Sequence, residues 1–260
     1  MIAWPALPWI WLACALTMVA VWVIAVRADN LGYVDVAWAA LMGAMAIAVA
    51  LSGHGAVLPR ALIGALGALW GLRLCTHLFQ RVHGEPEDGR YTALRTQWHD
   101  RKLLVFGFFQ LQALVIALFA VPLLAAVSNP VAQPTRWIVA GVLVWLLSVG
   151  GETLADRQLS QWRNDPANHG KTCRAGLWAW SRHPNYFFEF LHWFGYVLFA
   201  IGAPLWWIAL SGPLVMFGFV YRVTGIPYTE AQALRTRGED YRKYQREVSA
   251  FFPWPPTHSD

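Results

Sequence analysis

The chain has 260 residues, of which 57% are hydrophobic and only 13% are charged. A soluble protein carries roughly 25% charged residues, so the composition excludes an ordinary soluble enzyme. The 16 tryptophans agree with this, because tryptophan gathers at bilayer interfaces. The net charge of +5 comes from loops rather than from a basic domain, so we expect no nucleic-acid partner. The composition predicts an all-α polytopic membrane protein.

Seven apolar stretches approach the roughly 20 residues that a helix needs to cross a bilayer. They are expected at 7–26, 31–51, about 59–79, 103–127, 136 to beyond 152, 184–201 and 205 to about 226. A basic stretch at 228–248 follows and predicts an amphipathic helix on the membrane surface. No basic segment precedes the first apolar run, so we interpret that run as a permanent membrane helix rather than a signal peptide.

The distribution of basic residues predicts the orientation. Of the 20 Lys and Arg residues, all but Arg60, Arg73 and Arg136 fall in loops that seven spans place on one side. Because such residues concentrate in cytoplasmic loops, we expect the N-terminus outside and the C-terminus in the cytoplasm of a multi-pass inner-membrane protein. We treat residues 1–260 as one membrane domain, with substrate-side helices in 1–127 and cofactor-binding helices and the tail in 136–254.

A polar stripe follows the end of the fifth predicted span. Spacings of four and seven residues place Glu152, Asp156 and Arg163 on one helix face. Carboxylates accept hydrogen bonds from ribose hydroxyls, and arginine forks onto phosphate, so the stripe suits a nucleotide-type cofactor. The alternative is a polar helix end that simply meets water.

The sixth predicted span begins in the motif Ser-Arg-His-Pro-Asn-Tyr-Phe-Phe-Glu at 181–189. Pro184 suits the first turn of a helix, where its missing N–H costs nothing. Asn185 and Glu189 are four residues apart and share one face. A carboxylate inside a membrane span is costly and usually marks a site. We therefore predict that this motif holds one end of a cofactor.

Basic and aromatic side chains in the later loops and the tail extend this prediction. Lys171 and Arg174 lie in the loop before the motif, where they suit either an anionic cofactor or simple topology. Arg222, at the inner end of the last span, suits a phosphate or carboxylate. Tyr241 and Tyr244 belong to a tail that suits cofactor contact or membrane anchoring.

The sequence predicts no metal site and no disulfide. His183 and His192 are nine residues apart, which is not the spacing of a helical metal pair. Cys14, Cys75 and Cys173 show no paired spacing. No glycine-rich phosphate loop is present either, so any nucleotide must be bound by the membrane helices and their cytoplasmic ends.

Several of these motifs together resemble the steroid 5-alpha-reductase C-terminal domain superfamily, in a bacterial branch of it. The motifs are the Ser-Arg-His-Pro-Asn-Tyr element with Glu189, the Gly-Leu-Trp turn before it, the Asp156 and Arg163 stripe, Asp-Pro-Ala-Asn at 165–168, Gly-Ile-Pro at 225–227, Tyr241 with Tyr244, Val-Asp-Val-Ala-Trp at 34–38 and Glu-Asp-Gly-Arg-Tyr at 87–91. The Arg-His-Pro-x-Tyr element also occurs in isoprenylcysteine carboxyl methyltransferases, which use S-adenosylmethionine.

The resemblance implies a seven-helix reductase that binds NADPH in a cavity facing the cytoplasm. A lipophilic enone would enter from the bilayer. The implied cofactor contacts are Asp156, Arg163, Asn185, Glu189, Arg222 and Tyr241, with Arg182, His183 and Tyr186 as additions.

The first three predicted spans depart from the steroid reductases. The second span lacks their Gln-Glu pair and has Asp35 as its only acid, and the third has Trp70 and Arg73 near the position of their tyrosine. A reductase needs a donor to polarise the substrate carbonyl. We expect that donor among Tyr33, Arg73, His77 and Tyr91, with Asp35 holding one of them in place.

The leading hypothesis is NADPH-dependent reduction of a carbon–carbon double bond conjugated to a carbonyl in a lipophilic substrate. One alternative is a membrane methyltransferase that uses S-adenosylmethionine. The other is a non-catalytic membrane protein that binds lipid or quinone. The sequence leaves the substrate, the proton donor and the oligomeric state open.

Overall fold

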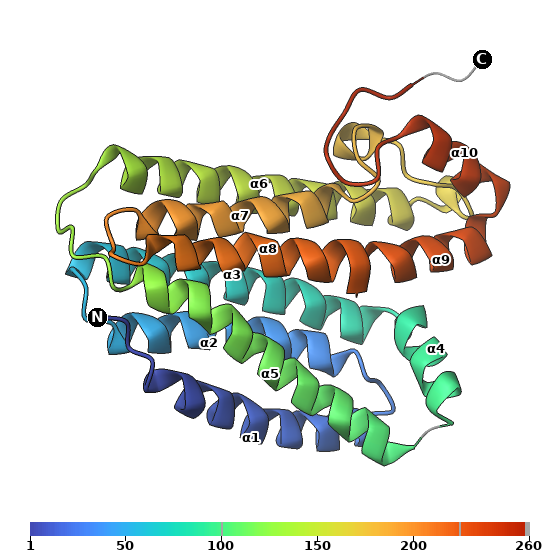
Figure 1. The fold of residues 1–260 in the computed structure, drawn as a ribbon. Helices are drawn as coiled ribbons and strands as arrows, with labels where there is room; N and C mark the ends of the chain where they lie inside the picture. The colour runs from blue at the N-terminus through green and yellow to red at the C-terminus, as the bar shows by residue number, and fades with distance from the viewer. Residues whose placement is uncertain (100, 224, 258–260) are drawn as a thin grey trace. The chain divides into compact units, whose positions relative to one another are not determined.

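The computed structural model describes residues 1–99, 101–223 and 225–257, and these residues form helices and no β-strand (Figure 1). The α-helices are α1 Ala6–Arg27, α2 Tyr33–Ser52, α3 Val57–Gly84, α4 Gly89–Trp98, α5 Lys102–Ala126, α6 Arg136–Asn164, α7 Pro184–Ala200, α8 Ser211–Gly218, α9 Ile226–Arg237 and α10 Glu239–Glu247. Short 3-10 turns are η1 Pro166–Asn168, η2 Gly176–Ala179 and η3 Trp206–Leu210, and η4 Phe219–Val223 is a π-helix.

Six helical segments of the described chain are long and apolar enough to cross a membrane. They are Ala6–Arg27, Tyr33–Ser52, Val57–Gly84, Lys102–Ala126, Arg136–Asn164 and Trp206–Arg237. The prediction of an all-α membrane protein is therefore confirmed. The expected sixth span forms α7, but its 17 residues fall below the roughly 20 that span a bilayer without tilt or thinning.

The chain divides into two compact units. Unit 1 comprises Met1–Val139 and Tyr196–Gly212, and unit 2 comprises Ala140–Gly195 and Pro213–Asp260. The division falls inside α6 and α7, so each of these helices contributes to both units. The assignment of one part to substrate and the other to cofactor stays a prediction.

In unit 1, α2 and α3 pack closely because small residues line their contact. A Cβ added to Gly71 would come within 2.7 Å of the Gly43 Cα, and one added to Gly67 would meet the Ala46 Cβ at 2.4 Å. Small residues let membrane helices approach closely, and the resulting van der Waals contact drives their association. α1 and α5 pack against α2 and complete the group of long helices (Figure 1).

A buried asparagine fixes the end of α7 within unit 1. The Asn129 amide donates to the carbonyls of Phe199, at 2.8 Å, and Ile201, at 3.1 Å. The main-chain carbonyl of Asn129 accepts a hydrogen bond from the Ala56 N–H in the turn between α2 and α3. These bonds satisfy backbone groups that would otherwise be buried without partners, so they define one end of the unit.

In unit 2, glycines bring α6 and α7 together as antiparallel neighbours. A Cβ on Gly195 would meet the Gly141 carbonyl at 3.1 Å, and one on Gly151 would meet the Phe188 ring at 2.4 Å. The contact with the higher residue number on α7 has the lower residue number on α6, so the two helices are antiparallel. Residues one turn later on α7 therefore lie level with residues one turn earlier on α6.

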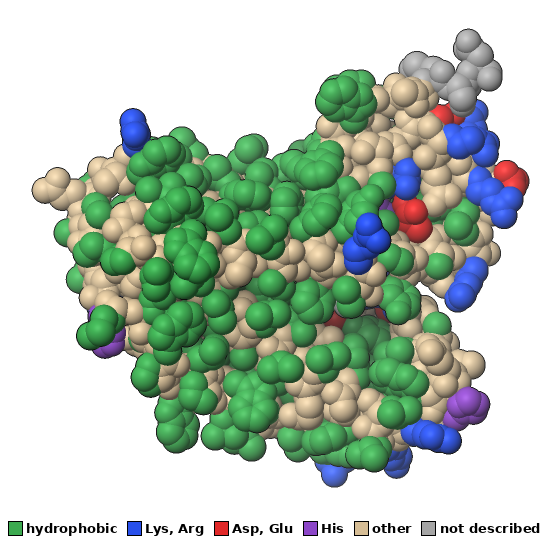
Figure 2. Space-filling view, in the orientation of Figure 1, with side chains coloured by type: hydrophobic (Ala, Val, Ile, Leu, Met, Phe, Trp, Pro, Cys, Tyr) green, Lys and Arg blue, Asp and Glu red, His purple; other side chains and the backbone are tan. Residues whose placement is uncertain are grey.

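The tail differs from the single amphipathic helix expected at 228–248. It divides into α9 and α10 at Gly238, whose φ of 52° favours glycine. On α10, Tyr241 and Tyr244 are buried in a cluster with Ala233 and Val248. Figure 2 shows Lys and Arg side chains gathered around α9 and α10. The aromatic face of α10 is therefore directed into the protein.

Candidate functional site

The two polar stripes predicted on α6 and α7 meet in unit 2. The Asn185 side chain donates to the Asp156 carboxylate, with 3.3 Å between Nδ2 and Oδ1. Pro184 is the first residue of α7, as predicted, so Asn185 stands in the first helical turn. The side-chain carbonyl of Asn185 also accepts a hydrogen bond from the Tyr186 N–H. The start of α7 is thereby fixed to the stripe on α6.

Each helix carries a further carboxylate one turn from this contact. Glu152 precedes Asp156 by four residues and Glu189 follows Asn185 by four. Because α6 and α7 are antiparallel, Glu152 and Glu189 lie at the same level along the pair. Glu152 is only 3% exposed. Unit 2 thus presents a face of three carboxylates and one amide, which suits a cationic, hydroxyl-bearing ligand.

The loop between α6 and α7 is held against α6 beside this face. The Gln158 side chain accepts from the Leu177 N–H at 2.9 Å, and the Trp178 indole donates to the Ala155 carbonyl at 2.9 Å. Gly176, with φ of 57°, makes the turn that brings η2 onto Gln158. The predicted Gly-Leu-Trp turn therefore closes the loop over the end of α6.

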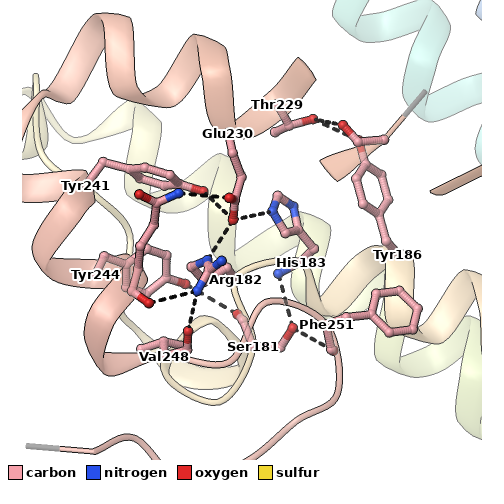
Figure 3. A network of polar contacts seen from close by, with 12 residues as sticks. Ser181, Arg182, His183, Tyr186, Thr229, Glu230, Tyr241, Tyr244, Val248 and Phe251 are labelled. Atoms are coloured by element: carbon pink, nitrogen blue, oxygen red, sulfur yellow. Dashed lines mark hydrogen bonds and ion pairs between the residues drawn. The ribbon is translucent and has the colours of Figure 1, made fainter. Parts of the chain in front are cut away.

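Glu230 of α9 is the acceptor on which the Arg-His motif converges, as Figure 3 shows. Its Oε1 accepts from the Arg182 Nε at 2.6 Å and its Oε2 from the Gln245 amide at 2.8 Å. The Tyr241 hydroxyl and the His183 Nε2 lie 3.4 Å from Oε1. Sequence reasoning assigned no role to Glu230, although it joins three of the predicted cofactor residues.

Arg182 also binds the backbone of the tail. Its Nη1 donates to the carbonyls of Gln245, at 3.0 Å, and Val248, at 2.6 Å. Its own N–H donates to the Ser249 carbonyl at 2.8 Å. Arg182 therefore connects the loop before α7 to the chain after α10.

His183 lies behind this ion pair. Burial lowers its pKa, while the hydrogen bond and charge of Glu230 raise it less, so the pKa falls below the usual histidine range. The imidazole stacks on Tyr186, with ring centroids 5.4 Å apart. Tyr186 in turn shares a hydrogen bond with the Thr229 hydroxyl at 3.3 Å. A neutral His183 is therefore held between Glu230 and Tyr186 (Figure 3).

Arg174 and Tyr244 form a second connection between loop and tail. Arg174 pairs with Glu247 at 2.6 Å and with Asp240 at 3.3 Å, and it lies over the Tyr244 ring at 5.5 Å. The buried Tyr244 hydroxyl donates to the Trp178 carbonyl at 2.5 Å. Burial raises the pKa of Tyr244, which keeps this hydroxyl a donor.

Three further predicted cofactor residues are exposed in the structure: Arg163, Lys171 and Arg222. Arg163 ends the α6 stripe and Lys171 follows η1. Arg222 lies in the π-helix η4, beside the Tyr221 ring at 5.9 Å. Their roles stay predictions.

Among the residues predicted to be catalytic, the structure brings Asp35 and Tyr91 together in unit 1. The Tyr91 hydroxyl donates to Asp35 at 2.6 Å, and Arg90 pairs with the same carboxylate at 3.3 Å. Asp88 caps α4 through the Arg90 N–H. Burial raises the pKa of Asp88, but the Arg90 and Arg81 charges and the Arg90 hydrogen bonds outweigh it and lower the pKa to about 2. The Glu-Asp-Gly-Arg-Tyr motif therefore fastens α4 to α2.

The other three predicted catalytic residues lie elsewhere in unit 1. Tyr33 faces His83, with 3.4 Å between its hydroxyl and the imidazole Nε2. Arg73 and His77 are half-buried one turn apart on α3. The prediction that one of these groups polarises a carbonyl depended on the reductase hypothesis.

A relative that is named for a different activity contradicts that hypothesis. Over 105 residues the chain is 30% identical to a methanethiol S-methyltransferase of Mycobacterium tuberculosis (strain ATCC 25618 / H37Rv). The match spans 38% of this chain and 37% of that protein, so it covers little more than a third of the relative's length. No solved structure matches the chain.

The predictions of an NADPH-dependent reductase and of NADPH as cofactor are therefore wrong. The structure gives the physical reason for the error. Arg174 was expected to suit an anionic cofactor and Arg182 to contact it, but their guanidinium groups pair with Glu247, Asp240 and Glu230. A methyl-donor cofactor of the S-adenosylmethionine type carries no phosphate and needs none of these charges.

A family model matches residues 21–248, which include all of α2 to α10. The description of that family is "Protein of unknown function (DUF1295)". The match extends over both units, including the α6–α7 face and the Glu230 cluster. The chain belongs to the DUF1295 family.

Proposed function

We propose that this protein is a membrane methyltransferase that uses S-adenosylmethionine and methylates the sulfur of a small lipophilic thiol. The observation that carries the proposal is the acidic face of unit 2, formed by Glu152, Asp156, Asn185 and Glu189. The named relative supports the methyl-transfer chemistry and the thiol acceptor.

The composition of this face fits the proposed cofactor. S-adenosylmethionine carries an ammonium, a sulfonium and ribose hydroxyls. Carboxylates accept hydrogen bonds from the ammonium and the hydroxyls, and their negative charge attracts the sulfonium. Glu152 is 3% exposed, so one of the carboxylates of this face lies in the protein interior. When bound, the cofactor supplies an electrophilic methyl group.

The protein would bind the cofactor, orient it towards the thiol and exclude water from the site. Asp156 and Asn185 already hold each other, so they would meet a ligand without losing side-chain freedom. The loop fixed by Gln158 and Arg182 would limit access of water to the start of α7. In the transfer the bond from the methyl carbon to the donor sulfur breaks as its bond to the thiol sulfur forms. The thiol proton leaves to solvent.

We further propose that α7 crosses the bilayer as a seventh span of an inner-membrane protein, with the N-terminus outside. Its 17 residues extend about 26 Å, close to the thickness of a thin bilayer. Asn129 holds its end beside the turn between α2 and α3, and Arg182 holds its start on the basic tail. Helix α7 therefore runs from a basic segment towards an uncharged turn.

Ligand-dependent thermal stability tests the proposed function. Detergent-purified protein should melt at higher temperature with S-adenosylmethionine and at unchanged temperature with NADPH, because a ligand stabilises the state that binds it. At a concentration of 100 times Kd the gain is about 2.7 kcal/mol. With Asp156→Asn or Glu152→Gln, the same rise in melting temperature should require at least about ten times more S-adenosylmethionine. Asp165→Asn, an exposed acid in η1's cap, is the control and should behave as the parent protein.

Product formation provides the second readout. With a small alkyl thiol, the protein should release S-adenosylhomocysteine and the methyl thioether in equal amounts. A shift with NADPH alone, or no shift with S-adenosylmethionine in folded protein, would exclude the proposed function.

A further inference from the structure

The surface of unit 1 has a groove between the end of α2 and the first three turns of α3. Its volume is about 420 Å³. Its lining includes Leu51 of α2 and Val57, Arg60, Ala65 and Ala68 of α3. Every lining side chain except Arg60 is apolar. The groove exists because α3 presents small residues outward here, while Leu51 and Val57 stand above its floor at 75% and 76% exposure.

The single charge among the lining side chains stands near the end of the groove that lies at the α2–α3 turn. Arg60 lies in the first turn of α3, and its Nε and Nη2 donate to the carbonyls of Ala50 and Leu51 at 2.8 and 3.2 Å. A guanidinium has five N–H donors, so these two bonds leave capacity for a further acceptor. Within the described residues no carboxylate pairs with Arg60. The positive charge is therefore fixed in place by helix α2 without being neutralised.

The groove as a whole is about as long as one leaflet is thick. Val57 and Ala68 are eleven residues apart on α3, which corresponds to about 16 Å along the helix axis. Half of the roughly 30 Å hydrocarbon core is about 15 Å. The turn between α2 and α3 that forms the mouth is held rigidly, because Gly55 and Ala56 donate to the carbonyls of Val127 and Asn129.

We propose that this groove binds one glycerophospholipid, with its anionic phosphate at Arg60 and an acyl chain along the small residues of α3. Each part of the lipid has a matching part of the groove: the phosphate meets a cation at the interface, and the chain meets an apolar channel of leaflet length. Arginine binds phosphate in a fork, which favours this headgroup over a neutral one. The lipid belongs to the leaflet on the side of the α2–α3 turn.

Native mass spectrometry of the detergent-purified protein with phosphatidylglycerol tests the proposal. The parent protein should retain one lipid, and diacylglycerol with the same acyl chains should bind roughly tenfold or more weakly. Arg60→Gln should weaken phosphatidylglycerol to the same degree. Ala65→Trp, at an exposed position of the groove floor, should block both lipids. Arg136→Gln, at the start of α6, is the matched control and should bind as the parent does.

The variants separate binding from folding. Arg60 also caps the end of α2, so the melting temperature of each variant without lipid is measured first. If Arg60→Gln fails to fold, the result for Ala65→Trp tests the proposal. Equal retention of phosphatidylglycerol and diacylglycerol would overturn the headgroup assignment, and unchanged binding by Ala65→Trp would overturn the groove. Neither result bears on S-adenosylmethionine binding, which involves residues of unit 2.

Discussion

At the residue scale, Glu230 and its donors explain how the Arg-His motif is used. The sequence singled out Arg182, His183 and Tyr241 but offered no sign of their common partner. Glu230 is 48 residues from Arg182, in a tail that also carries Glu239, Asp240 and Glu247. Only its contacts with Arg182, His183 and Tyr241 in the folded protein distinguish Glu230 from these other acids. Arg182 and Arg174, both predicted to contact a cofactor, pair in the structure with carboxylates of the chain itself.

Replacing Glu230 should destabilise unit 2. Glu230→Gln removes the charge that Arg182 faces, and both side chains are largely buried. A hydrogen bond to a charged group contributes about 1.5–3 kcal/mol, so we expect a loss of that order in the free energy of unfolding. Denaturant unfolding in detergent measures it. Glu239→Gln, which breaks an exposed pair with Arg242, should change stability by less than about 0.5 kcal/mol. Equal effects of both substitutions would contradict the central role of Glu230.

His183 should make stability depend on pH. Its pKa in the folded protein is below the usual value, so the unfolded chain binds a proton that the folded chain refuses. Its contribution is therefore complete above about pH 6.5 and is lost as the pH falls below that value. Glu230, Arg182 and Arg237 act on the same imidazole. Melting temperatures from pH 8 to 5 should fall, and His183→Gln should flatten the curve. An unchanged slope in the variant would assign the effect to other groups.

At the element scale, the start of a helix could be predicted from the sequence more easily than its breaks or the face by which it packs. The start of α7 followed from Pro184, because proline restricts the backbone locally. The polar extension of α6 followed from residue spacing. The break at Gly238 was not foreseen, because a glycine in an amphipathic stretch is often tolerated within a helix. Tyr241 and Tyr244 were expected to contact a cofactor or anchor the tail in the membrane, whereas they are buried against the protein in the structure.

The α2–α3 contact should resist any added side chain. In Gly71→Ala the new Cβ would meet the Gly43 Cα at 2.7 Å and the Ala39 carbonyl at 2.8 Å, both backbone atoms that cannot rotate away. Overpacking of this kind costs about 1–3 kcal/mol. Gly107→Ala on α5 is the control, because nothing lies within 4 Å of its Cβ. Thermal unfolding should show a loss for the first and no loss for the second. Similar melting temperatures would mean that the helices separate at little cost.

At the scale of the whole molecule, the sequence predicted the class and erred on the activity. A bilayer acts on entire segments, so composition and hydropathy were sufficient to identify a membrane protein. The cofactor depends on which charges remain after internal pairing, and spacing along the chain does not reveal pairs such as Arg174 with Glu247. The Arg-His-Pro-x-Tyr element was common to both enzyme classes considered, so it did not separate them.

The proposed topology predicts opposite accessibility for two exposed histidines. A cysteine at position 54, in the turn between α2 and α3, should react with a membrane-impermeant maleimide in intact cells. A cysteine at position 169, in the basic loop after η1, should react only after permeabilisation. The substitutions His54→Cys and His169→Cys are made in a variant without Cys14, Cys75 and Cys173. Labelling of both positions in intact cells would refute the orientation.

The bonds between Arg182 and the carbonyls of Val248 and Ser249 have a consequence for biosynthesis. These carbonyls come after every membrane helix in the chain, and Trp254 binds Trp180 later still. During translation the α6–α7 loop therefore leaves the ribosome long before its partners exist. The membrane helices can insert in order, but the loop must wait for residues 248–254. We expect the newly inserted protein to form its loop-to-tail hydrogen bonds as one of the last events of its synthesis.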